Sequence, residues 1–352
     1  MNPTMETQTQ AHKFPLPLDF DNVSTLPDSY EWSTTTLPSD DPCHYTNNDR
    51  KASLPVIDIG DPSAYDLMRH ACEKWGAFQV INHGVPLSLF RETELQTRRL
   101  FSLPTEQKLL AARLPATLCG YGSAYFQAFY TKLMWSEGFG MTGSPLEHAR
   151  KLWPEDHAKF CEVMEQCQAE MKTLCNKIVG IMLGSLGLTH EDDMNWFQPQ
   201  NGSDQIQCLF HLNSYPVCPN PDRAMGLAPH TDTSLITVVN QGNIGGLQVY
   251  QDGAGWVPVE LVEGAFVVNV GDLMQIVTNG KFKSVLHRVV VNNTCHRLAT
   301  SFFLLASPDA KISPLRQLVD SSHPPLYQAV TGKEYFQLKY KFFNKALESI
   351  RL

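Results

Sequence analysis

Residues 226–239, GLAPHTDTSLITVV, hold two groups that can bind a metal within a run of apolar and β-branched residues. We predict that this run is a buried strand, in which side chains at positions i and i+2 point to the same face. His230 and Asp232 are separated by one residue, so an imidazole and a carboxylate should point into the same space. Two histidines and one carboxylate form the facial triad that binds iron(II) and leaves coordination positions open for chemistry.

A third ligand is expected from a strand far along the chain. His287 lies in the strand-like run SVLHRVVV, and Arg297 opens the next such run, RLATSFFLL. Burying an arginine without an anionic partner is costly, and a bound carboxylate would supply that partner. We therefore predict a metal site at His230, Asp232 and His287, with Arg297 binding a carboxylate nearby.

Two other histidines are interpreted as structural. His190 and Asp192 repeat the His-x-Asp spacing, but they lie where a helix is expected to begin. Acidic residues in a first turn stabilise the helix dipole, and side chains two positions apart on a helix diverge. His211 lies on an otherwise apolar strand, and we interpret it as a core residue with satisfied hydrogen bonds.

Composition and periodicity divide the chain into four parts. Residues 1–53 are rich in Pro, Ser, Thr and Asn and should form an irregular N-terminal arm. Residues 54–200 should be a mixed α/β, mainly helical region. Over 201–310, short strand-like runs alternate with turn residues, which predicts an antiparallel jelly roll. Residues 311–352 should form a C-terminal extension with a helix. The predicted fold class is α+β, with a double-stranded β-helix (jelly-roll) core.

Two helices are predicted from the spacing of apolar residues. Over about 156–187, apolar residues recur at steps of three and four, which is typical of a long amphipathic helix. A last helix is expected over about 331–350.

Charge and cysteine content exclude several classes of protein. The net charge is −8 and no basic run is present, which argues against a nucleic-acid-binding surface. The nine cysteines include no CxxC pair, so a zinc site or a disulfide framework is not expected and a reducing compartment fits best. No apolar stretch is long enough to span a bilayer, and the first residues do not resemble a secretory signal. We predict a cytoplasmic protein that can diffuse into the nucleus.

The motifs together resemble those of the plant 2-oxoglutarate/Fe(II)-dependent dioxygenases. The HTD motif, the distal His and the Arg are preceded by LNSYPVCPNPDRAMGL and by GAFQVINHGV. Four further stretches narrow the resemblance to the gibberellin 3-beta-dioxygenases (gibberellin 3-oxidases): KLMWSEGF, VLHRVVVNNT, SPLRQLV and FFNKALESIR. The resemblance extends from about residue 26 to the C-terminus.

The resemblance implies a role for each residue of the site. The iron(II) ligands would be His230, Asp232 and His287. Arg297 would bind the distal carboxylate of 2-oxoglutarate with help from Tyr215. Asn213 would line the same cosubstrate site.

The implied reaction is the hydroxylation of a gibberellin at carbon 3 on the β face, which produces a bioactive gibberellin. It would consume O2 and convert 2-oxoglutarate to succinate and CO2, with ascorbate as reductant. The only partner expected is a small-molecule substrate, a gibberellin or a related diterpenoid acid, with no nucleic acid and no membrane. The aromatic segment 125–139 either lines the substrate pocket or belongs to the core.

One residue departs from the family pattern. The family has Arg-x-Ser after the distal His, whereas this chain has Arg297-Leu298-Ala299. The serine hydroxyl that would bind the cosubstrate is therefore missing. Ser301 is on the same face of the strand but about 6–7 Å further along, which is too far for it to substitute. We predict weaker binding of 2-oxoglutarate.

Two alternatives remain open at the level of sequence. A related plant dioxygenase could oxidise another gibberellin position or another diterpenoid. A protein with the same fold could instead bind a hormone or metal without catalysis, and Ala299 gives that alternative some support. A zinc hydrolase is disfavoured because no general base accompanies the triad.

Overall fold

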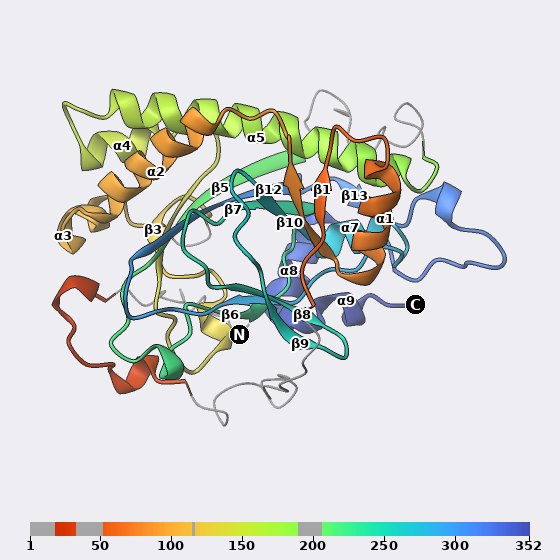
Figure 1. Cartoon of the computed structure of the whole chain (residues 1–352). Coiled ribbons are helices and arrows are strands. Elements are labelled where there is room, and N and C mark those ends of the chain that lie inside the picture. Colours follow the sequence, from red (N-terminus) through yellow and green to blue (C-terminus); the bar gives the residue numbers. More distant parts are fainter. Residues whose placement is uncertain (1–17, 33–51, 115–116, 189–205) are drawn as a thin grey trace, which may run out of the picture.

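The computed structural model describes residues 18–32, 52–114, 117–188 and 206–352, and in it two β-sheets lie one above the other (Figure 1). In spatial order, the strands of the larger sheet are β1 (Val56–Asp58), β2 (Ala77–Ile81), β10 (Phe266–Val270), β7 (Ile236–Asn240), β12 (Arg297–Ala306), β5 (Ile206–Tyr215), β4 (Glu137–Met141) and β3 (Gly120–Gly122). Those of the smaller sheet are β6 (Leu227–His230), β11 (His287–Val289), β8 (Leu247–Gln251) and β9 (Gly255–Pro258). This arrangement confirms the predicted jelly roll.

The larger sheet combines strands from both halves of the chain. All its neighbouring strands are antiparallel except β1 and β2, which are parallel. The strands β1 to β4 come from the predicted 54–200 region, and the remaining four come from 201–310. The two regions therefore share one sheet.

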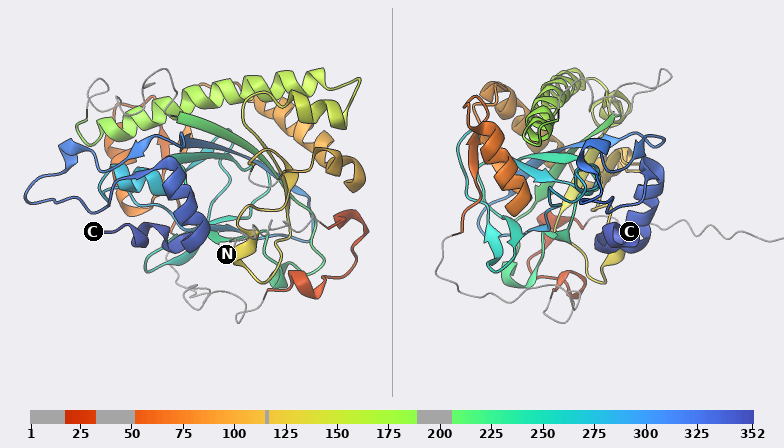
Figure 2. Two further views of the ribbon diagram at one scale, coloured as in Figure 1. Left: turned by 180° about the vertical axis from the view of Figure 1, so that it is seen from behind. Right: turned by 90° about the vertical axis from the view of Figure 1, so that its right-hand side faces the viewer.

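Helices cover the outer face of the larger sheet. The long helix α5 (Ala158–Gly184) confirms the predicted amphipathic helix and runs across that face beside α2 (Leu87–Phe101), as Figures 1 and 2 show. The other helices are α1 (Ala64–Lys74), α3 (Thr105–Lys108), α4 (Leu146–Leu152), α7 (Asp272–Val277), α8 (Gly332–Phe342) and α9 (Ala346–Ser349). Among the described residues, no helix is long and apolar enough to cross a membrane.

Both faces of the larger sheet are buried, and alternate residues of each strand serve different cores. On β5 and β12, Leu212 and Phe302 pack with the helices. Tyr215 and Ala299 point to the other face, where they pack with Val249 and other residues of the smaller sheet. The interior between the sheets is thus lined by one set of alternating positions.

The C-terminal segment closes one end of this interior. The helix predicted over 331–350 is broken into α8, a short 3-10 turn (Phe343–Lys345) and α9. The break occurs at Phe343, whose φ of 50° is uncommon for a non-glycine residue. A two-stranded sheet, β13 (Lys311–Ile312) with β14 (Val330–Thr331), leads into α8.

Candidate active site

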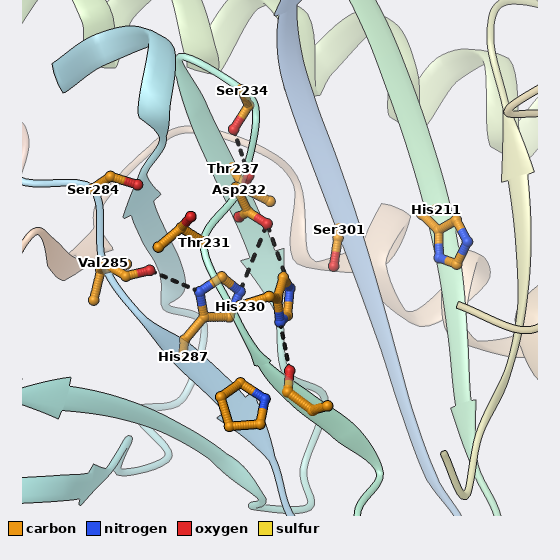
Figure 3. A network of polar contacts seen from close by, with 12 residues as sticks. His211, His230, Thr231, Asp232, Ser234, Thr237, Ser284, Val285, His287 and Ser301 are labelled. Atoms are coloured by element: carbon orange, nitrogen blue, oxygen red, sulfur yellow. Dashed lines mark hydrogen bonds and ion pairs between the residues drawn. The ribbon is translucent and has the colours of Figure 1, made fainter. Parts of the chain in front are cut away.

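The structure brings the three predicted metal-binding residues together (Figure 3). His230 ends β6 and lies opposite His287, which opens the antiparallel strand β11. The Nε2 atoms of His230 and His287 are 3.6 and 3.7 Å from Oδ1 of Asp232. All three side chains are buried, and one ligand atom from each lies within 4.8 Å of the others.

The prediction of one continuous strand through this motif is wrong. Strand β6 ends at His230 and β7 begins at Ile236, in the other sheet. Asp232 lies in the connecting loop, where its carbonyl accepts a hydrogen bond from Asp272 N at 2.8 Å. The loop packs so closely against Gly271 that a Cβ there would clash with the Ser234 carbonyl. The backbone of Asp232 and Ser234 therefore pairs with the start of α7.

Backbone carbonyls set the orientation of the two imidazoles. Nδ1 of His230 is 2.8 Å from the carbonyl of Ala228, and Nδ1 of His287 is 3.1 Å from that of Val285. A carbonyl only accepts hydrogen bonds, so each Nδ1 carries a proton and each Nε2 points toward Asp232. Burial, reinforced by the neighbouring His287, holds the pKa of His230 well below its usual value. The imidazole is therefore neutral.

This set of atoms fits a divalent cation. Two imidazoles and a carboxylate converge, and Oδ2 of Asp232 is buried with no hydrogen-bond partner among the described residues. An unpaired buried carboxylate oxygen is costly. A bound metal ion would neutralise the charge and complete the environment of that oxygen.

Arg297 and Tyr215 form a second part of the site. They are paired residues of β12 and β5, and the guanidinium carbon lies 4.9 Å from the centre of the tyrosine ring. Arg297 is 2% exposed; its Nε donates to the carbonyl of Ile244, but its Nη1 has no partner in the part of the chain that the structure describes. Burial lowers the pKa of Arg297, and Tyr215 opposes that shift. Among the described residues no carboxylate forms an ion pair with this guanidinium, so an anionic ligand fits here.

The predicted role of Asn213 is less direct in the structure. Asn213 faces the interior opposite Ala299, but its Nδ2 donates to Ser301 Oγ at 3.2 Å. Its Oδ1 accepts a hydrogen bond from Nδ1 of His211 at 2.9 Å. Both ends of the amide are therefore engaged. The hydroxyl of Ser301 contacts Asn213, which fits the expectation that Ser301 does not replace the missing hydroxyl at Ala299.

The interpretation of His211 as a fully satisfied core residue is wrong. Its Nε2 is buried and has no hydrogen-bond partner among the described residues. Burial lowers the pKa of His211 to about 4, and the charge of Arg113 adds to the effect. Because Nδ1 donates to Asn213, Nε2 is an acceptor without a partner among the described residues. His211 lies on the same face of β5 as Tyr215, and Figure 3 shows it beside Ser301.

His211 should make folding stability depend on pH. The folded-state pKa of about 4 lies below the ordinary value, so the unfolded chain binds more protons between these two values. Stability should be complete above about pH 6.5 and fall by about 3 kcal/mol toward pH 4 from this residue alone. Urea unfolding across this range should show a shallower decline in His211→Phe. His323→Phe is the matched control, because His323 is exposed. An unchanged dependence of stability on pH in His211→Phe would refute the lowered pKa of His211.

An aromatic cluster adjoins the metal-binding residues. The ring of Phe126 lies 4.4 Å from that of His230, and Phe343 stacks on Phe129 at 4.7 Å. Trp32 packs against Tyr130 at 5.3 Å. The segment 125–139 therefore contributes aromatic side chains beside His230.

Sequence reasoning missed Trp32 and Phe343. Trp32 comes from the predicted irregular arm, and Phe343 from the break after α8. Neither residue carried a recognisable spacing signal, because both reach the site only through the tertiary fold. His190 and Asp192 lie outside the described residues.

The comparisons with known proteins agree with this geometry. The profile of the "2OG-Fe(II) oxygenase superfamily" matches residues 203–306, and that of the "non-haem dioxygenase in morphine synthesis N-terminal" matches residues 54–156. Gibberellin 3-beta-dioxygenase 3 of Arabidopsis thaliana is 46% identical, over 96% of this chain and 95% of its own length. Gibberellin 3-beta-dioxygenase 1 of Pisum sativum is 45% identical, over 97% of this chain and 90% of its own length.

Solved structures of related proteins show the same fold. The crystal structure of JOX2 in complex with 2OG, Fe and JA superposes with a TM-score of 0.79 at 30% identity, covering 100% of this chain and 98% of that one. A rice dioxygenase for auxin oxidation gives a TM-score of 0.71 at 29% identity, covering 85% and 100%. The chain belongs to the 2OG-Fe(II) oxygenase superfamily and, within it, to the family of the gibberellin 3-beta-dioxygenases.

Proposed function

We propose that the protein hydroxylates a gibberellin at carbon 3 on the β face, using Fe(II), 2-oxoglutarate and O2. The observation that carries this proposal is the convergence of two imidazoles, one carboxylate and a buried arginine in one barrel interior, where no described carboxylate pairs with the arginine. Relatives named gibberellin 3-beta-dioxygenases, at 44–47% identity over nearly the whole chain, support the choice of substrate and position.

Each group of residues has one task in this reaction. His230, Asp232 and His287 would hold iron(II) through Nε2, a carboxylate oxygen and Nε2. Arg297 would pair with the distal carboxylate of 2-oxoglutarate in the bidentate geometry that guanidinium groups favour, and Tyr215 would fix its orientation. When bound, iron and cosubstrate supply the oxidation of a C–H bond to C–OH, as O2 converts 2-oxoglutarate to succinate and CO2.

The rest of the barrel orients the substrate and excludes water. Phe126, Phe129, Tyr130 and Phe343 form an apolar aromatic cluster beside the metal-binding residues. A rigid, apolar diterpenoid acid suits such walls. No side chain has to transfer a proton to or from the substrate carbon, so the chain's contribution is placement of the reacting C–H bond.

Product analysis tests the proposal. The full chain is incubated with iron(II), ascorbate, 2-oxoglutarate and a gibberellin that lacks the 3-hydroxyl group, and the products are identified by mass spectrometry and NMR. We expect a 3β-hydroxylated product and one succinate per product. A hydroxyl at another carbon would overturn the position, and no substrate-coupled succinate would overturn the oxygenase assignment in favour of a binding protein.

Restoring the missing hydroxyl should strengthen cosubstrate binding. Ala299 is buried, faces the interior and lies two residues after Arg297 on β12. In Ala299→Ser, a new hydrogen bond to the carboxylate is worth about 1.5 kcal/mol, so we expect the KM for 2-oxoglutarate to fall roughly tenfold. Ala306→Ser, at the far end of the same strand, is the control. An unchanged KM in Ala299→Ser would contradict the expectation.

We also propose that the protein works in the cytoplasm on a small-molecule substrate. The composition and the cysteine content favour a reducing compartment. A fluorescent fusion of the full chain, imaged in plant cells, would test this location, and signal confined to an organelle would contradict it.

A further inference from the structure

Asp272, the first residue of α7, has a buried carboxylate that lies behind the metal-binding residues. It is 1% exposed and forms an ion pair with Lys339 of α8 at 2.7 Å. Tyr335, one turn earlier on the same face of α8, donates its hydroxyl to Asp272 at 2.9 Å. Helix α8 therefore presents two donors to a single buried carboxylate.

The same carboxylate connects both chain segments that carry the predicted ligands. Its Oδ1 accepts a hydrogen bond from Ser284 at 2.6 Å, three residues before His287. Its Oδ2 accepts from Thr231 at 3.4 Å, and Thr231 lies between His230 and Asp232. Figure 3 shows Thr231 and Ser284 on the same side of the histidine pair.

Lys339 and the backbone of Asp272 form further hydrogen bonds with the segment that carries His230 and Asp232. The ammonium of Lys339 donates to Thr231 Oγ1 at 2.5 Å as well as to the carboxylate. The amide of Asp272 donates to the carbonyl of Asp232 at 2.8 Å. One ion pair is thus bonded directly to the segment of the first two ligands and, through Ser284, to the segment of the third.

A second contact from the C-terminal segment reaches the same loop. Asn344, just after α8, accepts a hydrogen bond from Thr231 N at 3.2 Å and donates to the carbonyl of Pro229 at 3.1 Å. The positive φ of Phe343 allows the chain to turn here while that ring packs against Phe126. A strained backbone conformation of this kind persists only where surrounding contacts enforce it.

We propose that helix α8 sets the geometry of the metal site, with Lys339 and Tyr335 acting as positioning residues through Asp272. The inference rests on the proposed assignment of His230, Asp232 and His287 as iron ligands. None of the positioning residues is one of the three predicted ligands; they fix the relative placement of the two chain segments that must supply ligands to within a few tenths of an ångström. Outer partners of this type commonly change metal affinity about 10–100-fold when removed.

Titration of the metal-free full chain with iron(II) under anaerobic conditions, with and without 2-oxoglutarate, tests the proposal. The variants are Lys339→Met, Tyr335→Phe and Ser284→Ala, and Lys339→Arg tests rescue by a conserved charge. Lys341→Met is the matched control because Lys341 is exposed on the same helix. The thermal unfolding midpoint of each metal-free variant is measured in parallel.

We expect the Kd for iron(II) to rise about 10–100-fold in Lys339→Met and by a smaller factor in Tyr335→Phe and Ser284→Ala. Lys341→Met should bind iron like the parent chain, and Lys339→Arg should recover part of the affinity. Lower unfolding midpoints with unchanged iron affinity in the three variants would show a merely structural role and overturn the proposal. If Lys339→Met does not fold, unchanged affinity in both Tyr335→Phe and Ser284→Ala overturns it equally.

The test separates this inference from the proposed function. If the ligand assignment were wrong, His230→Ala would bind iron(II) as well as the parent chain does. If only the role of α8 were wrong, His230→Ala would lose the metal while Lys339→Met kept it.

Discussion

Asp232→Ala is expected to lose iron binding and substrate hydroxylation while remaining folded. The carboxylate is the only anionic member of the triad. Removing a residue that only hydrogen-bonds to a metal ligand lowers activity by up to about 100-fold, so loss of the ligand itself should lower turnover by more than that. Its Oδ2 has no hydrogen-bond partner among the residues the structure describes, and removing an unsatisfied buried acceptor does not destabilise the metal-free chain. The unfolding midpoint of the metal-free variant should therefore equal or exceed that of the parent.

Thermal unfolding with and without iron(II) measures both effects. The parent chain should be stabilised by the metal, because a ligand that binds only the folded state raises the free energy of unfolding. Asp232→Ala should show no such increase. The matched control is Asp252→Ala, which removes an exposed carboxylate. A parent-like rise in midpoint with iron(II) in Asp232→Ala would contradict the assignment.

Arg297→Gln is expected to weaken 2-oxoglutarate binding without loss of iron. Glutamine keeps a polar side chain but removes the buried positive charge and the bidentate donor. Truncating one member of a buried charge pair costs about 2–5 kcal/mol, so the KM for 2-oxoglutarate should rise at least 30-fold. The Kd for iron(II) in the absence of cosubstrate should stay within about twofold.

Steady-state kinetics over a wide range of 2-oxoglutarate concentrations measures the change. Arg316→Gln is the control, because Arg316 lies in a short surface turn outside the barrel. Arg297→Lys keeps the charge but not the planar guanidinium group, so its KM for 2-oxoglutarate should lie between those of the parent chain and Arg297→Gln. An unchanged KM in Arg297→Gln would show that the cosubstrate carboxylate binds elsewhere.

Much of the fold could be predicted because its signals are local. The stripe of apolar residues over Ala158–Gly184 predicts a helix that buries one face, and that helix is α5. Alternating residues predict the strands of the jelly roll. The change of sheet between His230 and Ile236 could not be predicted, because it depends on the close approach of this loop to Gly271, which is distant in the sequence.

Some residues of the site could be predicted from the sequence and others could not. His230, Asp232, His287 and Arg297 are polar residues within largely apolar runs, and their spacing together with the family motifs marks them in the sequence. Lys339 gives no such signal, since a lysine on an amphipathic helix is most often solvated. Only the tertiary fold reveals that its ammonium is buried against Asp272.

The most direct test of the account is an anaerobic titration of the full chain with iron(II) and 2-oxoglutarate, followed by visible absorption. The account predicts a charge-transfer band that needs both components, is lost in His230→Ala and Asp232→Ala, and requires much more 2-oxoglutarate in Arg297→Gln. A band that persists unchanged in His230→Ala and Asp232→Ala would show that iron and cosubstrate do not meet at these residues.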